Sequence, residues 1–417
     1  MKHLAKHRSM RRLAPYGVIG TATLSMLVAC ADSVVLGSED DAPDGGTVTL
    51  PPSDGGGVDV DVDAAPPEAG PDADGGIPIC SKDGFCHSVL PQGQHLVDVW
   101  GDGQGTVWTV SREGNILRWD GSAWTIHHSV AGEARSVWGS GPTDVWVATS
   151  LGLLRGQGET AASLVFSFVP DLPGDEYIPL QSVSGTGPND VWIVGSVESY
   201  DSYPPDFYNR VIHYGGDDAD GGTGFTLDDD LSSRWISFRR VWASPGAGIW
   251  VHGMSVDDEG WTYARVFQRP AGASTWTEFP LPRDPSNMGT TASTVYGAGL
   301  SSDSTVVLRG QTLAQGSALW RGTSADNGQT FSFSYAPEKA WHRWYYAFWG
   351  TAPDDTWGVG AQGLLNHWDG TKWDVATARL GEVPIDKSFF AIWGTTTDDF
   401  WVVGDEIAVH KTNAGKP

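Results

Sequence analysis

The chain has 417 residues, of which 18% are charged and 40% hydrophobic, and it contains 54 Gly, 25 Pro and 21 Trp. Its 51 acidic residues outnumber its 26 basic ones, for a net charge of −25. This balance argues against nucleic acid as a partner, because nucleic-acid binding depends on Lys and Arg that neutralise phosphates. So much Gly and Trp, without long stretches of apolar residues at helical spacing, favours many short strands joined by tight turns.

Residues 1–29 have the layout of an export signal. Five basic residues precede an apolar run, Tyr16 to Ala29, whose 14 residues suit a signal and are too few to span a bilayer. The run ends in Leu27-Val28-Ala29-Cys30, which resembles the lipobox of bacterial lipoproteins, where cleavage precedes a cysteine that is then acylated. The resemblance implies lipidation of Cys30 and a cell-envelope protein held to a membrane by its acyl chains. The outer membrane is favoured, and periplasmic and surface-facing orientations both stay open. The alternative is an ordinary signal peptide with a chance cysteine.

Residues 30–78 are predicted to form a disordered tether. The segment is rich in Asp, Gly and Pro, has no Lys or Arg, and has no aromatic residue that could start a core. Alternating acids at Asp59, Asp61 and Asp63 suggest a calcium loop, but the glycine and the terminal glutamate of an EF-hand loop are missing. We therefore expect a solvated spacer that its own charges keep extended.

Two cysteines follow the tether. Cys80 and Cys86 are an even pair in an exported chain, which predicts a disulfide that closes a small loop. A zinc site fits less well, because His87 alone stands nearby and tetrahedral zinc needs four ligands.

The rest of the chain repeats one pattern, seen most clearly from Ala347 to Trp373. Short aromatic and β-branched runs alternate there with Gly, Asp and Pro, the signature of consecutive antiparallel strands. A period of roughly 40 to 50 residues with four strands per unit is typical of propeller blades. Seven copies of the first strand can be counted: Val99-Trp100-Gly101, Val137-Trp138-Gly139, Val183-Ser184-Gly185, Val241-Trp242-Ala243, Val295-Tyr296-Gly297, Phe348-Trp349-Gly350 and Ile392-Trp393-Gly394.

The sequence therefore predicts an all-β, seven-bladed β-propeller of four-stranded blades over residues 79–412, followed by a short tail, 413–417. The last copy stops one strand short of a full blade. Near the other end, His87-Ser88-Val89 echoes His128-Ser129-Val130 of the first blade's fourth strand. We expect the N-terminal strand to complete the last blade and close the ring.

One segment carries a family resemblance. Residues 324–331, SADNGQTF, resemble the Asp-box of sialidase-like and BNR-repeat propellers, with matches at Ser324, Asp326, Gly328, Thr330 and Phe331. In that family the motif is a structural turn between the third and fourth strands of a blade, opposite the ligand face. The resemblance implies a fold and not hydrolysis, because the arginine cluster, the Tyr/Glu nucleophile pair and the acid/base Asp of a sialidase cannot be placed in blade order here.

Candidate binding residues gather on loops that share one face of a propeller, namely those between second and third strands and those that cross to the next blade. Aromatic rings beside Arg and carboxylates suit sugar stacking or a protein interface, although many rings in so Trp-rich a chain will simply pack between blades. The candidates are Tyr200, Tyr203, Tyr208, Trp235, Arg239, Trp261, Trp341, His342, Arg343 and Trp344.

These features favour binding over catalysis. No catalytic set, cofactor motif or metal site stands out, and we expect a monomeric, membrane-anchored recognition scaffold of the cell envelope whose ligand is a protein or a glycan. The alternative is a glycan-active hydrolase or lyase that uses loop carboxylates with Arg239, Arg240 or Arg343. A third hypothesis is a structural module whose acidity serves solubility alone.

Overall fold

The computed structural model describes residues 80–81, 83–217, 222–283, 285, 290–314, 316–336, 344–376, 379–380 and 383–413. The signal, Cys30 and the tether lie outside the described residues. So do Trp341, His342 and Arg343. Among the described residues, no helix has the length and apolarity needed to cross a membrane.

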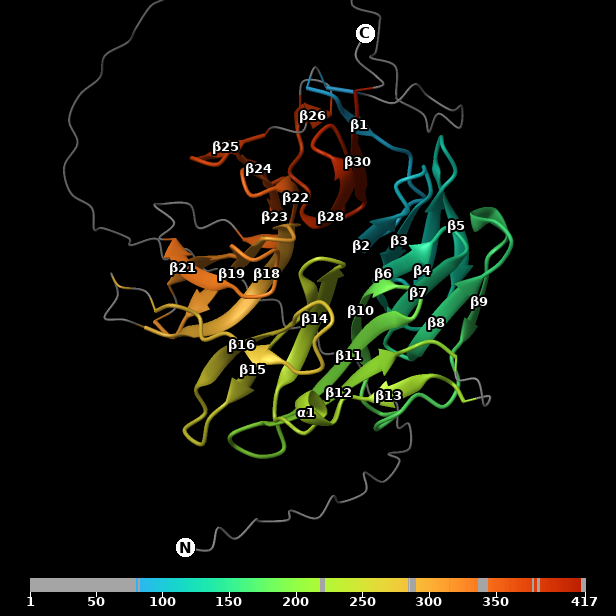
Figure 1. The fold of residues 1–417 in the computed structure, drawn as a ribbon. Helices are drawn as coiled ribbons and strands as arrows, with labels where there is room; N and C mark the ends of the chain where they lie inside the picture. The colour runs from blue at the N-terminus through green and yellow to red at the C-terminus, as the bar shows by residue number, and fades with distance from the viewer. Residues whose placement is uncertain are drawn as a thin grey trace, which may run out of the picture. The chain divides into compact units, whose positions relative to one another are not determined.

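The fold is an all-β propeller (Figure 1). The first two sheets consist of β2 (Leu96–Gly101), β3 (Val107–Ser111), β4 (Asn115–Trp119) and β5 (Trp124–Ser129), then β6 (Ala134–Gly141), β7 (Asp144–Thr149), β8 (Gly152–Gln157) and β9 (Val165–Phe168). The next two consist of β10 (Leu180–Gly187), β11 (Asp190–Ser199), β12 (Asp206–Tyr214) and β13 (Phe225–Leu227), then β14 (Ser237–Ser244), β15 (Gly248–Val256), β16 (Thr262–Arg269) and β17 (Thr277–Glu278).

The remaining strands follow the same order along the chain. They are β18 (Ala292–Ser302), β19 (Thr305–Thr312), β20 (Ser317–Thr323), β21 (Ser332–Ala336), β22 (Tyr345–Ala352), β23 (Asp355–Gly360), β24 (Leu365–Trp368), β25 (Trp373–Val375), β28 (Phe389–Thr396), β29 (Asp399–Gly404), β30 (Ile407–Lys411) and β1 (Phe85–His87). A small ribbon, β26 (Arg379–Leu380) with β27 (Val383–Pro384), and two short helices, η1 (Ala161–Ser163) and α1 (Asp229–Ser232), lie in the connections.

The expectation of seven four-stranded blades is wrong. Five four-stranded sheets stand separately, whereas β18–β21 and β22–β25 are joined in one eight-stranded sheet by a parallel bridge between Ala298 and Ala347. Two glycines permit this close approach: a Cβ at Gly297 would lie 2.8 Å from the carbonyl oxygen of Tyr345, and one at Gly299 would lie 1.9 Å from that of Phe348. Because neither residue has a side chain, the two backbones meet where other copies keep a ring between them.

The same glycines correct the alignment of the fifth copy. The first-strand Trp pairs with the second-strand Trp in other copies, as Trp100 does with Trp108. In the fifth copy Val307 stands in the second-strand position and pairs with Gly299. The equivalent of Val99-Trp100-Gly101 is therefore Ala298-Gly299-Leu300, three residues beyond the predicted Val295-Tyr296-Gly297.

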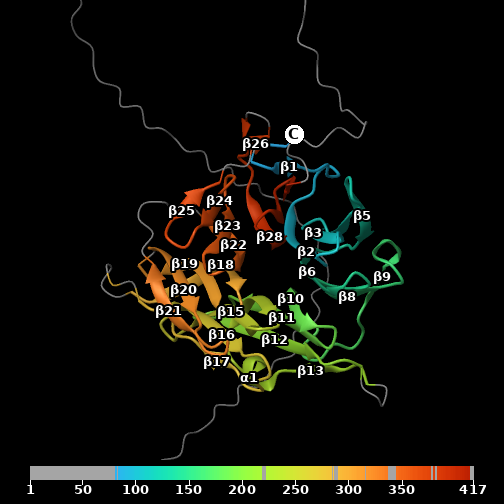
Figure 2. The same cartoon turned by 45° about the horizontal axis from the view of Figure 1, so that its top comes forward.

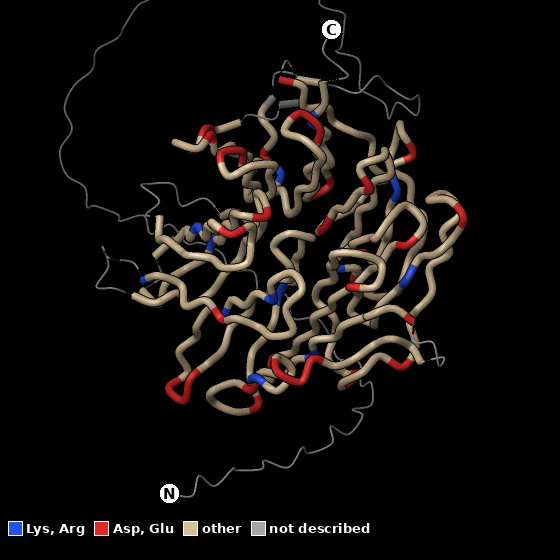
Figure 3. Tube along the Cα trace, viewed as in Figure 1, with Lys and Arg blue, Asp and Glu red and all other residues tan. Residues whose placement is uncertain are grey.

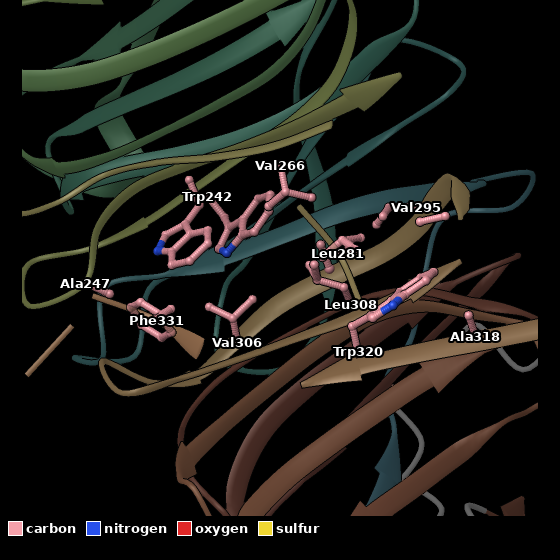
Figure 4. Packing of buried hydrophobic residues seen from close by; sticks show 13 residues of the cluster. Trp242, Ala247, Val266, Leu281, Val295, Val306, Leu308, Ala318, Trp320 and Phe331 are labelled. Carbon is pink, nitrogen blue, oxygen red and sulfur yellow. The ribbon is translucent and has the colours of Figure 1, made fainter. Parts of the chain in front are cut away.

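The sheets surround a common centre, with β2, β6, β10, β18, β22 and β28 innermost in Figure 2. The core lies between neighbouring sheets, since second strands such as β3 are buried along their whole length. Figure 4 shows one such layer, where Trp242 and Trp250 pack toward Phe331 and Val306. Burial of these large rings is the main favourable contribution that holds adjacent sheets together.

The ring closes through the N-terminal strand. β1 pairs with β30 in antiparallel register, with Cys86 opposite His410. Cys80 and Cys86 form a disulfide at this point, and the ring of Phe85 packs edge-on against Phe400 at 6.1 Å. The innermost strand of the last sheet, β28, lies beside β2 of the first.

Candidate functional site

Each innermost strand carries a β-bulge near its start. In β2, Leu96 pairs with Ser111 and Asp98 pairs with Val110, so Val97 is an extra residue. The same irregularity recurs in all seven innermost strands, and we call the extra residues the bulge ring: Val97, Arg135, Gln181, Arg239, Tyr296, Tyr346 and Phe390. A bulge bends its strand and redirects a side chain, so this repeat supplies one redirected side chain from each innermost strand.

The bulge ring lies on the face that carries the second-to-third-strand loops, because the start of each innermost strand pairs with the end of the next strand. We call this the loop face. Its composition is uneven around the ring. Tyr346 and Phe390 are neighbours with ring centroids 5.3 Å apart, and Tyr296 packs against Trp344 at 5.1 Å. The other members are Val97, Gln181 and two arginines.

An ion pair spans the centre one residue deeper. Asp98 of β2 accepts from Arg240 Nη2 of β14 at 3.2 Å, although the two strands belong to the first and fourth sheets. Asp98 also accepts from Ser136 Oγ at 2.8 Å and from the backbone N–H of Val137 at 3.1 Å. The carboxylate is buried, so these donors compensate for its lost hydration.

The third and fourth sheets form a pocket of about 540 Å³ on the loop face. Its walls come from the β11–β12 and β15–β16 loops and the strand ends beside them: Tyr200, Asp201, Ser202, Tyr203, Pro205, Phe207, Met254, Val256, Gly260 and Thr262. The Tyr203 hydroxyl donates to the carbonyl oxygen of Glu259 at 2.9 Å and so ties the two loops together.

Carboxylates around this pocket are already engaged. Glu198 accepts from Tyr200 Oη at 2.5 Å and from Ser237 Oγ at 2.9 Å, and it pairs with Arg239. The bond from Tyr200 raises the pKa of that phenol, because deprotonation would place two anions side by side. Asp257 accepts from two backbone N–H groups and from Tyr263 Oη at 2.8 Å. Neither acid is free to act as a general acid or base.

The structure brings some of the predicted residues together and separates others. Tyr200 and Tyr203 line the pocket and are 73% and 80% exposed, whereas Trp261 lies on the loop that forms its far wall. Tyr208 and Trp235 are exposed on the same two sheets, outside the pocket lining. Arg239 belongs to the bulge ring, and Trp344 packs against it. Among the described residues no group of three or more His, Cys, Asp or Glu is placed to hold a metal ion.

Sequence reasoning missed most of the bulge ring. Each member stands three residues before the Trp position of its copy, as Val97 precedes Trp100 and Phe390 precedes Trp393. Comparing that column between copies would have revealed its change from polar to aromatic. The misaligned fifth copy hid Tyr296, which was taken for the Trp position itself.

The Asp-box-like segment lies between β20 and β21. Asp326 accepts from the backbone N–H of Thr330 at 2.9 Å, from Thr330 Oγ1 at 2.6 Å and from Ser324 Oγ at 2.7 Å. The bonds from Thr330 and Ser324 lower the pKa of Asp326 to about 2. Phe331 is buried against Trp250, with ring centroids 4.8 Å apart.

No protein-family model matches this chain, and no curated protein matches it. Solved structures do. YCF48 from Cyanidioschyzon merolae is 15% identical with a TM-score of 0.54, covering 80% of this chain and 99% of its own. YCF48 bound to D1 peptide is 14% identical with a TM-score of 0.54, covering 82% and 99%. A catalytically inactive virginiamycin B lyase from Staphylococcus aureus with quinupristin is 11% identical with a TM-score of 0.54, covering 78% and 97%.

The likeness is one of fold. These neighbours include a protein that binds a peptide and a lyase, so at identities this low the shared propeller does not decide between binding and catalysis.

Proposed function

We propose that the protein is a recognition scaffold that binds a segment of a protein or a glycan on its loop face. The pocket between the third and fourth sheets carries the proposal. It combines exposed tyrosines with backbone and side-chain polar groups, and its volume of about 540 Å³ is in the range of ligand pockets. The hydrogen bond between Tyr203 and Glu259 orders the walls before a ligand arrives, which reduces the entropy lost on binding.

Binding is favoured over catalysis because Glu198 and Asp257 are held by tyrosines, backbone and arginine. A neighbouring propeller that binds a peptide supports the same reading by analogy of fold alone. The glycan-active hydrolase or lyase stays the second candidate, and a lyase among the fold neighbours keeps it open.

Peptide and glycan arrays should identify a ligand, and the variants Tyr200→Ala and Trp261→Ala should each weaken its binding by about tenfold or more, because exposed aromatic side chains often dominate such contacts. Phe168→Ala is the matched control, since Phe168 is an exposed ring at the end of the outer strand β9. Unchanged affinity in both pocket variants would overturn the assignment of the site. Turnover of a glycan or peptide by the wild-type protein would replace binding by catalysis.

We also propose that the scaffold is held at the cell envelope by a lipid on Cys30, as the Leu27-Val28-Ala29-Cys30 segment suggests. Acyl chains anchor a chain because each buried methylene contributes about 0.8 kcal/mol. A Cys30→Ser protein should therefore move from the membrane fraction to the soluble fraction. Continued sedimentation with membranes would contradict lipid anchoring.

A further inference from the structure

A second hollow lies on the loop face, beside the bulge ring. It has a volume of about 220 Å³ and is lined by Val97, Arg112, Glu133, Ala134, Arg135 and Gln181. None of these residues lines the pocket of the third and fourth sheets. With about 30 Å³ per water-sized group, the hollow has room for roughly seven such groups, which is about one amino-acid residue.

Two cations and one anion line this hollow. Arg135 is already satisfied, because its Nε and Nη2 donate to Glu133 Oε2 at 3.0 and 2.9 Å and its Nη1 donates to the carbonyl oxygen of Leu180 at 3.1 Å. The lone acid of the hollow is thus occupied by the arginine beside it.

Arg112 is different. Among the described residues no carboxylate lies within ion-pair distance of it. The adjacent Glu113 is held by His95 instead, through the His95 backbone N–H at 3.0 Å and Nδ1 at 2.6 Å. The guanidinium of Arg112 stacks over the ring of Phe390 at 5.1 Å. In a chain with a net charge of −25, and with acids on many loops of the ring (Figure 3), an exposed arginine that pairs with a ring and not with an acid keeps its donors available.

The hollow also borders the aromatic part of the bulge ring, since Arg112 joins it to Phe390 and Phe390 joins Tyr346 at 5.3 Å. A ligand that suits both parts has an anion and an apolar group a few bonds apart. The terminal residue of a peptide has this arrangement, with a planar carboxylate that matches the donor fork of a guanidinium beside a side chain that can lie on rings.

We propose that this hollow binds the carboxylate of a peptide chain end, with Arg112 as the main cationic contact and the side chain of the last residue against Phe390 and Tyr346. The site is separate from the pocket that carries the proposed function. Substitutions at Tyr200 or Trp261 therefore leave it intact, and either proposal can fail alone.

N-acetylphenylalanine tests this site, with its uncharged amide and free acetate as comparisons, by calorimetry or ligand-detected NMR on the folded propeller. The acid should bind with a Kd on the order of 1 mM, as a ligand of this size with one strong ionic contact reaches. The amide and acetate should each bind at least about tenfold more weakly, because each lacks one of the two groups. Affinity for the acid should fall as salt is raised, since Arg112 is exposed and its field is screened.

Two variants assign the contact. Arg112→Gln should weaken binding of the acid by about tenfold and leave the amide unchanged, because only the charge-assisted bonds are lost. Glu133→Gln should tighten binding of the acid, since it removes the repelling carboxylate and frees Arg135. Lys372→Gln is the matched control, because it removes one positive charge from the exposed turn between β24 and β25. Equal binding of acid and amide, an unchanged affinity in Arg112→Gln, or no binding of the acid to the wild-type protein would each overturn the proposal.

Discussion

At the scale of single residues, His252 is the most perturbed group near the centre of the propeller. It is fully buried in β15, directly opposite Arg240 of β14, and its ring lies 5.6 Å from that of Trp242. Its Nδ1 has no hydrogen-bond partner among the described residues. Burial, and then the charges of Arg240 and Arg239, lower the pKa of His252 from 6.5 to about 3. The imidazole is therefore neutral in the folded protein at any pH at which the protein works.

This shift makes stability depend on pH in a defined direction. Between pH 6.5 and about 3 the unfolded chain binds a proton at His252 that the folded chain does not, so the free energy of unfolding is greatest above pH 6.5 and falls as pH decreases. The slope from this one group approaches about 1 kcal/mol per pH unit, the free energy of one proton per unit. Urea unfolding at pH 7.5, 6.5 and 5.5 should show a shallower dependence in His252→Gln than in the wild type. His87 and His128, whose pKa values are also lowered, remain in both proteins, so identical slopes would contradict the assignment.

At the scale of elements, four sheets share a device that stiffens the second and third strands. An Asp at the start of the second strand accepts from a Ser or Thr four residues earlier, and a His or Arg of the third strand binds the same Asp and stacks on the Trp two residues after it. In the third sheet Asp190 accepts from His213 Nε2 at 2.8 Å, and the rings of His213 and Trp192 stack at 4.3 Å. The other sets are Ser140, Asp144, Trp146 and Arg155; Thr351, Asp355, Trp357 and His367; and Thr395, Asp399, Trp401 and His410.

This device shows what the sequence allowed and what it concealed. The recurring Trp was visible and correctly predicted strands, because aromatic residues at that spacing suit a buried pleated surface. Its cationic partner was not visible, since the hairpin between second and third strands varies in length and the third copy carries a long insertion before His213. The bulge ring escaped for a related reason. An extra residue in a strand leaves no mark in a pattern of alternating burial, and only pairing to the neighbouring strand reveals it.

At the scale of the whole molecule, the propeller was predictable, but the number of separate four-stranded blades was not. The repeat period and the strand count set the architecture, whereas the fusion of β18–β21 with β22–β25 depends on the missing side chains of Gly297 and Gly299. Reading copy five by its Val-Tyr-Gly pattern placed the aromatic residue where the structure has Gly299. The candidate site was predictable only in part: the sequence indicated the loops at Tyr200 and Tyr203, but it could not show that Tyr203 reaches Glu259 on the next sheet.

Ring closure rests on β1, and the structure allows its two attachments to be compared. The disulfide closes a loop with a sequence separation of 6, for which chain entropy gives a stabilisation of about 2 kcal/mol. Phe85 is buried between β30 and its neighbours and packs against Phe400 and Trp357 at 6.1 and 6.4 Å, and removal of such a ring costs about 3–5 kcal/mol. Phe85→Ala should therefore lower the free energy of unfolding more than the double variant Cys80→Ser with Cys86→Ser, and Phe168→Ala, an exposed ring, should change it by less than about 0.5 kcal/mol. Urea unfolding followed by near-ultraviolet circular dichroism measures all three. If loss of the disulfide proved more destabilising than loss of the ring, the covalent loop and not the packing of β1 would be what holds the propeller closed.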